Sequence, residues 1–123
     1  KYEEIEENEV RFEEFQCDDA DYILVAYGTA ARICEKTVEL ARKEGIKIGL
    51  LRPITLFPFP NKKLAELGES VKGFLTVEMS SGQMVEDVRL AVKGKAPVEY
   101  YGRMGGIVPS AEEVVDAIKQ KLL

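Results

Sequence analysis

Small polar residues and glycines follow two apolar stretches of this 123-residue sequence, an arrangement that can bind anions. Gly28-Thr29 follows one stretch, and Ser81-Gly82 comes shortly after another. Where such a turn begins a helix, its backbone N–H groups point outward and the helix dipole favours negative charge. Each turn could therefore hold a phosphate or a carboxylate. Neither residues 28–32 nor the glycine-rich residues 102–106 fit the dinucleotide-binding or P-loop pattern. Ordinary turn chemistry is therefore the favoured interpretation, and anion binding is the alternative.

Glu78 is the strongest single candidate for a proton-transfer group, because it stands at the end of an apolar stretch where a buried surface is expected. The sequence contains no histidine, the commonest general base and metal ligand. No lysine or second carboxylate stands beside Glu78 in the chain. We therefore favour an interface or helix-cap role for Glu78, and the sequence indicates no catalytic residue and no metal site.

Four apolar, β-prone stretches that alternate with helical patterns must position these residues. We expect strands over residues 22–27, 46–51, 74–77 and 98–101, with Arg52-Pro53 ending the second, and helices that begin after Thr29, Asn61, Gly82 and Ser110. Gly45 and Gly94 are expected helix stops, and Ser110 with Glu113 forms a capping box. This alternation predicts an α/β fold, a three-layer α/β/α sandwich with a mostly parallel sheet of four to five strands. Ligands and partners meet such sheets at the carboxyl ends of the strands.

The first part of the chain differs in charge from the rest. Residues 1–21 carry two basic and ten acidic side chains, a net charge of −8, whereas residues 22–123 carry 15 and 12, a net charge of +3. The spacing of Tyr2, Ile5, Phe12 and Phe15 fits one side of a helix. We expect residues 1–18 to form an acidic leader or linker helix, or a short helix with an extended segment, ahead of a domain over residues 19–123. A solvated helix face is the favoured interpretation, and docking on a basic surface of a partner is the alternative.

Composition excludes several classes of function. No apolar run approaches the roughly 20 residues that cross a bilayer, and no signal-peptide pattern is present, so we expect a cytoplasmic protein that binds no membrane. The acidic balance and the absence of a basic stripe argue against nucleic acid as a partner. Cys17 and Cys34 match neither a zinc pair nor a redox motif, and we expect both to be passive. A start at Lys1 without methionine suggests a fragment of a longer chain.

Several stretches taken together resemble a known family. Residues 24–32, Leu-Val-Ala-Tyr-Gly-Thr-Ala-Ala-Arg, and then Leu51-Arg52-Pro53 resemble the transketolase carboxyl-terminal domain of thiamine-dependent 2-oxoacid enzymes. Residues 77–89 contain Glu-Met-Ser-Ser-Gly-Gln-Met, which resembles the Glu-Met-x-x-Gly-Gln-Met segment of 2-oxoacid:ferredoxin oxidoreductase α subunits. The loop over residues 101–106 resembles the branched-chain, 2-oxoisovalerate type. The resemblance covers about residues 18–123.

The resemblance implies a component of an enzyme that oxidatively decarboxylates a 2-oxoacid to an acyl-coenzyme A and reduces ferredoxin. The full complex would use thiamine diphosphate, Mg²⁺ and iron–sulfur clusters. Four cysteines are needed for an ordinary cluster and this chain has two, and no Gly-Asp-Gly motif is present to hold magnesium and pyrophosphate. We therefore expect a non-catalytic carboxyl-terminal domain that binds no cofactor itself. Its expected partners are other domains of the α subunit, β, γ and ferredoxin-like δ subunits, and for the full enzyme ferredoxin and coenzyme A.

Within that resemblance, the residues at the strand ends are expected to contact partners or to bind an anion. The set is Gly28, Thr29, Arg52, Glu78, Ser81, Gly82, Gln83 and Arg103. Two other functions remain open at the level of sequence. One is a stand-alone module that binds an anion or nucleotide such as coenzyme A, and the other is the same domain from another thiamine-dependent enzyme.

Overall fold

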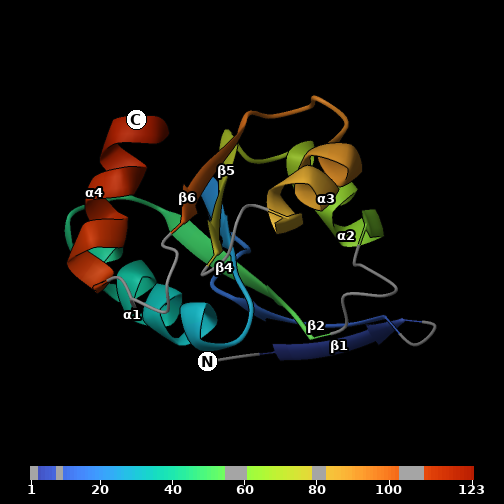
Figure 1. Ribbon diagram of the computed structural model, residues 1–123, viewed down its shortest axis with the longest axis horizontal. Coiled ribbons are helices and arrows are strands. Elements are labelled where there is room, and N and C mark those ends of the chain that lie inside the picture. The colour runs from blue at the N-terminus through green and yellow to red at the C-terminus, as the bar shows by residue number, and fades with distance from the viewer. Residues whose placement is uncertain (1–2, 8–9, 55–60, 79–82, 103–109) are drawn as a thin grey trace.

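The alternation of apolar strands and amphipathic helices produces the expected α/β architecture (Figure 1). The computed structural model describes residues 3–7, 10–54, 61–78, 83–102 and 110–123. In chain order the elements of these ranges are β1 (Glu3–Glu7), β2 (Val10–Phe15), β3 (Tyr22–Val25), α1 (Thr29–Lys43), β4 (Ile48–Pro53), α2 (Asn61–Gly68), β5 (Gly73–Glu78), α3 (Gln83–Val92), β6 (Val98–Gly102) and α4 (Ala111–Lys121).

All described strands belong to one sheet in the order β1-β2-β4-β3-β5-β6. The four strands expected from the sequence, β3 to β6, pair in parallel, whereas β2 pairs antiparallel with both β1 and β4. Helices α1 and α4 cover one face, and α2 and α3 cover the other (Figure 1). The three-layer α/β/α fold is therefore confirmed. The described sheet has six strands instead of four to five, because two antiparallel strands extend it beyond β4.

Each face of the sheet carries its own hydrophobic core, because successive side chains of a strand point to opposite faces. On β3, Ile23 and Val25 join the core under α2 and α3, and Leu24 joins the core under α1 and α4. All three side chains are fully buried. Burying a Leu, Ile or Val side chain contributes about 1.5–3 kcal/mol, so a strand that is apolar on both faces is stable only in the centre of such a sheet.

The helix expected for residues 1–18 is wrong, because β1 and β2 form an antiparallel hairpin there. Phe12 and Phe15 lie three positions apart on β2, so in a strand they point to opposite faces. Phe12 enters the core under α2 and α3, and Phe15 enters the core under α1. Both side chains are at most 4% exposed. Burial in two cores stabilises the strand more than a solvated helix could, and residues 3–15 are continuous with the sheet of the domain.

The residues expected to end and begin helices behave largely as the sequence indicates. Gly45 and Gly94 follow α1 and α3 with φ of 86° and 76°, values that favour glycine. The Ser110 capping box is present, with the Glu113 N–H donating to Ser110 Oγ at 3.1 Å and the Ser110 N–H donating to Glu113 Oε1 at 2.8 Å. Thr29 is the first residue of α1 and not its N-cap, a position that Gly28 takes.

Strand β4 also runs further than expected. The sequence indicated that Arg52-Pro53 would end the strand at residue 51, but both residues belong to β4 and pair with Glu13 and Phe12 of β2. The antiparallel strand β2 supplies pairing partners for these two residues, whereas the pairing of β4 with the parallel strand β3 ends at Leu51. Pro53 is the last residue of the strand, a position where the missing N–H is tolerated.

Candidate functional site

The carboxyl ends of the parallel strands meet at one edge of the sheet, where polar residues expected to be functional gather. Glu78 ends β5, Gly102 ends β6 and pairs with Glu78, and Gly28 follows β3 and begins α1. Tyr27 and Ile54, which follow β3 and β4, are 40% and 39% exposed. The edge therefore combines a buried acid, glycines and two exposed hydrophobic side chains.

The side-chain carboxylate of Glu78 lies at the start of α3, and the residue is only 2% exposed. Its Oε1 accepts a hydrogen bond from the Met84 N–H at 2.9 Å, and its Oε2 accepts one from the Val85 N–H at 3.0 Å. The first N–H groups of a helix have no partner within the helix, and the helix dipole favours a negative charge there. The helix-cap role of Glu78 is therefore confirmed. Its carboxylate occupies two amides that an anion bound after Ser81-Gly82 would need.

Tyr100 of β6 lies close to the charge of Glu78. Burial, and to a lesser extent the negative charge of Glu78, raise the pKa of the Tyr100 phenol. The Tyr100 hydroxyl lies over Gly102, in the space that a Cβ atom at that position would take. A side chain at position 102 would therefore make the Tyr100 ring shift, a contact that the sequence did not indicate.

Arg52 lies within β4 and not in a loop at the strand end. Its Nη1 donates to Oε1 of Glu13 at 3.0 Å, a cross-strand ion pair whose two side chains are 34% and 17% exposed. A residue expected to contact a partner thus also holds β2 against β4. Exposed ion pairs typically contribute about zero to 1 kcal/mol to the stability of the fold. This half-buried pair exceeds that range only if its geometry is well fixed.

The other predicted contact residues are only partly described. Gly28 has a φ of 63° and its C=O accepts from the Ala31 N–H at 3.1 Å. Thr29 and Gln83 are the first residues of α1 and α3. Ser81, Gly82 and Arg103 lie outside the described residues. The structure thus brings Gly28, Gln83 and Glu78 to the same edge of the sheet, whereas Arg52, the penultimate residue of β4, pairs with Glu13 of β2.

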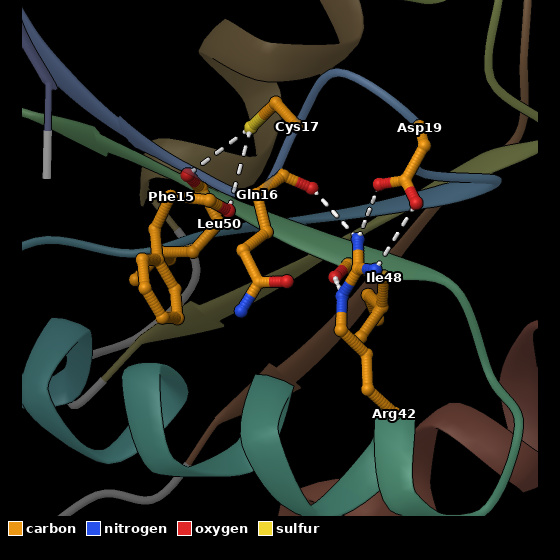
Figure 2. Close-up of polar contacts among 7 residues, drawn as sticks. All are labelled: Phe15, Gln16, Cys17, Asp19, Arg42, Ile48 and Leu50. Carbon is orange, nitrogen blue, oxygen red and sulfur yellow. Dashed lines mark hydrogen bonds and ion pairs between the residues drawn. The ribbon is translucent and has the colours of Figure 1, made fainter. Parts of the chain in front are cut away.

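A second polar cluster, centred on Arg42 at the end of α1, was not anticipated from the sequence (Figure 2). The Arg42 guanidinium donates to the Ile48 C=O and to the Gln16 C=O, each at 2.9 Å. It also binds both carboxylate oxygens of Asp19, at 2.8 and 3.3 Å. The hydrogen bonds and charge of Arg42 lower the pKa of Asp19. One side chain therefore joins α1, β4 and the segment that follows β2.

Ion pairs among the described residues neutralise part of the negative charge of the first segment within the chain itself. Three acidic residues of the first 21 pair with basic residues of the remainder: Glu13 with Arg52, Glu14 with Lys63 at 3.3 Å, and Asp19 with Arg42. The negative segment thus lies against positive side chains of its own domain. The opposite net charges of residues 1–21 and 22–123 were the signal that could have indicated this contact.

The described residues do not fit a metal ion or an iron–sulfur cluster. No group of three or more His, Cys, Asp or Glu side chains suited to a metal occurs among them. Cys17 and Cys34 are free and buried, and they belong to the cores on opposite faces of the sheet. Burial raises the pKa of the Cys17 thiol to about 12 and raises that of Cys34 as well. Among the described helices, none is long and apolar enough to span a membrane.

Two relatives found by sequence comparison with known proteins each match most of this chain. The chain is 52% identical over 120 residues to the ketoisovalerate oxidoreductase subunit VorB of Methanothermobacter thermautotrophicus, a match that covers 98% of this chain and 34% of that protein. It is 36% identical over 101 residues to the 2-oxoglutarate synthase subunit KorA of Methanothermobacter marburgensis, covering 82% of this chain and 27% of that protein. The chain thus spans about a third or less of the length of these relatives.

Two solved structures share the fold at low sequence identity. One is a 2-oxoglutarate:ferredoxin oxidoreductase from Magnetococcus marinus with 2-oxoglutarate, coenzyme A and succinyl-CoA bound, which matches with a TM-score of 0.75 at 20% identity, over 100% of this chain and 19% of that chain. The other is a split gene transketolase, an inactive tetramer of four beta subunits, with a TM-score of 0.73 at 21% identity, over 83% of this chain and 38% of that chain. The model of the pyruvate:ferredoxin oxidoreductase core domain II matches residues 20–114. This chain therefore belongs to the pyruvate:ferredoxin oxidoreductase core domain II family.

Proposed function

We propose that this chain is the non-catalytic carboxyl-terminal domain of the α subunit of a 2-oxoacid:ferredoxin oxidoreductase of the 2-oxoisovalerate type. The observation that carries the proposal is the 52% identity to a ketoisovalerate oxidoreductase subunit over nearly the whole chain. In this proposal the complete enzyme oxidatively decarboxylates a branched-chain 2-oxoacid, transfers the acyl group to coenzyme A and reduces ferredoxin. The role of the domain is to complete the subunit and to contact its neighbours.

The chemistry of the described residues supports a role in assembly. The Glu78 carboxylate, the best candidate for proton transfer, is buried and both of its oxygens accept backbone N–H groups. The described residues offer no ligand set for a metal or a cluster. Thiamine diphosphate, Mg²⁺ and iron–sulfur clusters are therefore assigned to other parts of the enzyme, together with β, γ and ferredoxin-like δ subunits. Because Glu78 already takes two amides at the start of α3, a stand-alone anion-binding module is the weaker alternative.

The carboxyl edge of the sheet is the proposed contact surface. Tyr27 and Ile54 follow the adjacent strands β3 and β4, and each is about two-fifths exposed. Thr29 and Gln83 are the first residues of the helices at this edge, and Gly28 is the N-cap of α1. Aromatic and aliphatic side chains that are exposed in one domain and gather at one place are typical of surfaces that bind another protein or domain.

The proposal is tested by comparing the isolated chain with the complete enzyme. The complete enzyme is expected to show 2-oxoisovalerate-dependent reduction of a dye, and the isolated chain is expected to show none. Turnover by the isolated chain would disprove a purely structural role. Complete enzyme that prefers 2-oxoglutarate over 2-oxoisovalerate would retain the family but refute the substrate type.

The contact surface has its own test in the complete enzyme. Tyr27→Ser and Ile54→Ser are expected to weaken assembly, measured as the fraction of α subunit that co-purifies with a tagged partner subunit. Leu90→Ser is the matched control, because Leu90 is 74% exposed on α3 and lies away from this edge. Equal losses for all three variants would show that the carboxyl edge is not the contact surface.

A further inference from the structure

The hairpin of β1 and β2 is joined to the rest of the domain by a short connection with an unusual backbone. Residues 16–21 lie between the end of β2 and the start of β3. Gln16, the first of them, has a φ of 56° although it is not glycine. The left-handed region costs free energy for a residue with a Cβ atom, so the connection is held in this shape by its surroundings.

Two features of the domain hold the connection against the sheet. Gly49 of β4 lies against it, and a Cβ atom there would come within 2.7 Å of the Gln16 carbonyl oxygen and 2.9 Å of Cys17 Cα. From α1, the Arg42 side chain binds the Gln16 carbonyl oxygen and the Asp19 carboxylate at the same time (Figure 2). Both contacts involve the Gln16 carbonyl as it is placed by the left-handed conformation that turns the connection back onto its own domain.

The contacts of the hairpin itself do not depend on that turn. Among the described residues, its attachment includes the antiparallel pairing with β4, the burial of Phe12 and Phe15, and ion pairs to Arg52 and Lys63. An identical hairpin from a second molecule could make every one of them. What distinguishes the two arrangements is the connection, which is compact and left-handed at Gln16 in one and extended in the other.

We propose that Arg42 is a lock that keeps the hairpin on its own sheet, and that without this lock two copies of the chain exchange their hairpins to form a dimer. The occupant of the β4 edge is then the hairpin of the second copy. Short connections under strain favour such exchange, since opening them releases the strain while all other contacts are kept. This inference does not depend on the proposed function.

The test is the oligomeric state of the 123-residue chain carrying Arg42→Met, measured by light scattering after size exclusion over a range of concentrations. The unmodified chain is expected to be monomeric. Arg42→Met is expected to raise the dimer-to-monomer ratio by about tenfold or more, since one hydrogen bond to a charged group is worth at least that factor. Gly49→Ala, which pushes the connection off the sheet, is expected to act in the same direction and serves if Arg42→Met does not fold.

Exchange is distinguished from other dimers by cross-linking. Cysteines introduced at Glu14 and Lys63, whose charged groups lie 3.3 Å apart, should be joined by a short bismaleimide within one chain in the monomer and between two chains in an exchanged dimer. Gln16→Gly, which removes the cost of a positive φ, should return the ratio toward monomer by roughly fivefold.

Arg52→Met is the matched control, because it removes an ion pair that both arrangements make. It should lower stability without raising the dimer fraction. Folded Arg42→Met or Gly49→Ala chain that stays monomeric, or a dimer whose cross-links remain within single chains, would overturn the inference.

Discussion

Glu78→Gln tests the physical account of the candidate site most directly. The substitution keeps the size and shape of the side chain but replaces one acceptor oxygen by an NH₂ group. In the structure the two carboxylate oxygens accept from the Met84 and Val85 N–H groups at 2.9 and 3.0 Å. The glutamine can satisfy only one of these donors, and its NH₂ group would face the N–H of the other.

The expected cost follows from these contacts. A hydrogen bond to a charged group contributes about 1.5–3 kcal/mol, and a buried donor left without an acceptor adds its desolvation cost. The favourable interaction of the charge with the helix dipole, about 0.3–1 kcal/mol, is lost as well. The lower cost of burying a neutral group offsets part of this loss, because Glu78 is only 2% exposed. We expect a decrease of about 2–3 kcal/mol in the free energy of unfolding.

Urea denaturation of the purified chain, followed by circular dichroism, measures this decrease. With a denaturant slope of about 1–3 kcal/mol/M, the midpoint should fall by roughly 0.7–3 M. Glu86→Gln is the control, because Glu86 also lies in the first turn of α3 but is exposed, and it should change the stability by less than about 0.5 kcal/mol. An unchanged midpoint for Glu78→Gln, or equal shifts for both variants, would refute the helix-cap account.

Three further outcomes are expected. The pKa of Asp19, followed by NMR, should lie below its ordinary value of 3.8 and return toward that value in Arg42→Met, and an unshifted pKa would contradict the contact. Because the pKa of Asp19 is lower in the folded state, the stabilisation by this pair is present above pH 3.8 and is lost as the pH falls through the folded-state pKa. Cys17 and Cys34 should react with a thiol reagent only slowly at pH 8 and fully in denaturant, since burial raises both pKa values; rapid labelling of the folded chain would show that a core is open. Ser110→Ala should lower the stability by about 1 kcal/mol in a melting experiment, whereas Ser110→Asp, which can still cap α4, should not.

The parallel part of the fold could be predicted because each of its signals is local. A strand buried on both faces must be apolar throughout, and residues 22–26 meet that condition before any contact is known. Gly45 and Gly94 follow helices with a positive φ, which residues with a Cβ atom rarely adopt. A glycine after a helical pattern therefore indicates the end of the helix in the sequence itself. Ser110 and Glu113 form their hydrogen bonds within one turn. These features decided the α/β class and the order of its elements.

The acidic segment shows where local signals were insufficient. Phe12 and Phe15 fit one side of a helix, and in a strand they point to opposite faces, so only a sheet covered on both sides can bury both. Nothing near them in the sequence indicates that β4 offers such a sheet. The same segment contains many glutamates, a residue depleted in strands, and tertiary burial outweighed that preference.

Residue types and spacings within short windows were enough to predict which segments form parallel strands, where the helices stop, and which family the chain resembles. How the charges pair and what Glu78 does became apparent only from the folded arrangement of the chain. The guanidinium of Arg42 meets the Gln16 carbonyl and the Asp19 carboxylate across more than 20 positions of the chain. Such contacts depend on where the backbone of distant segments passes, and Gly49 shows how close that passage is, since its lack of a side chain leaves the space that the Gln16 carbonyl occupies.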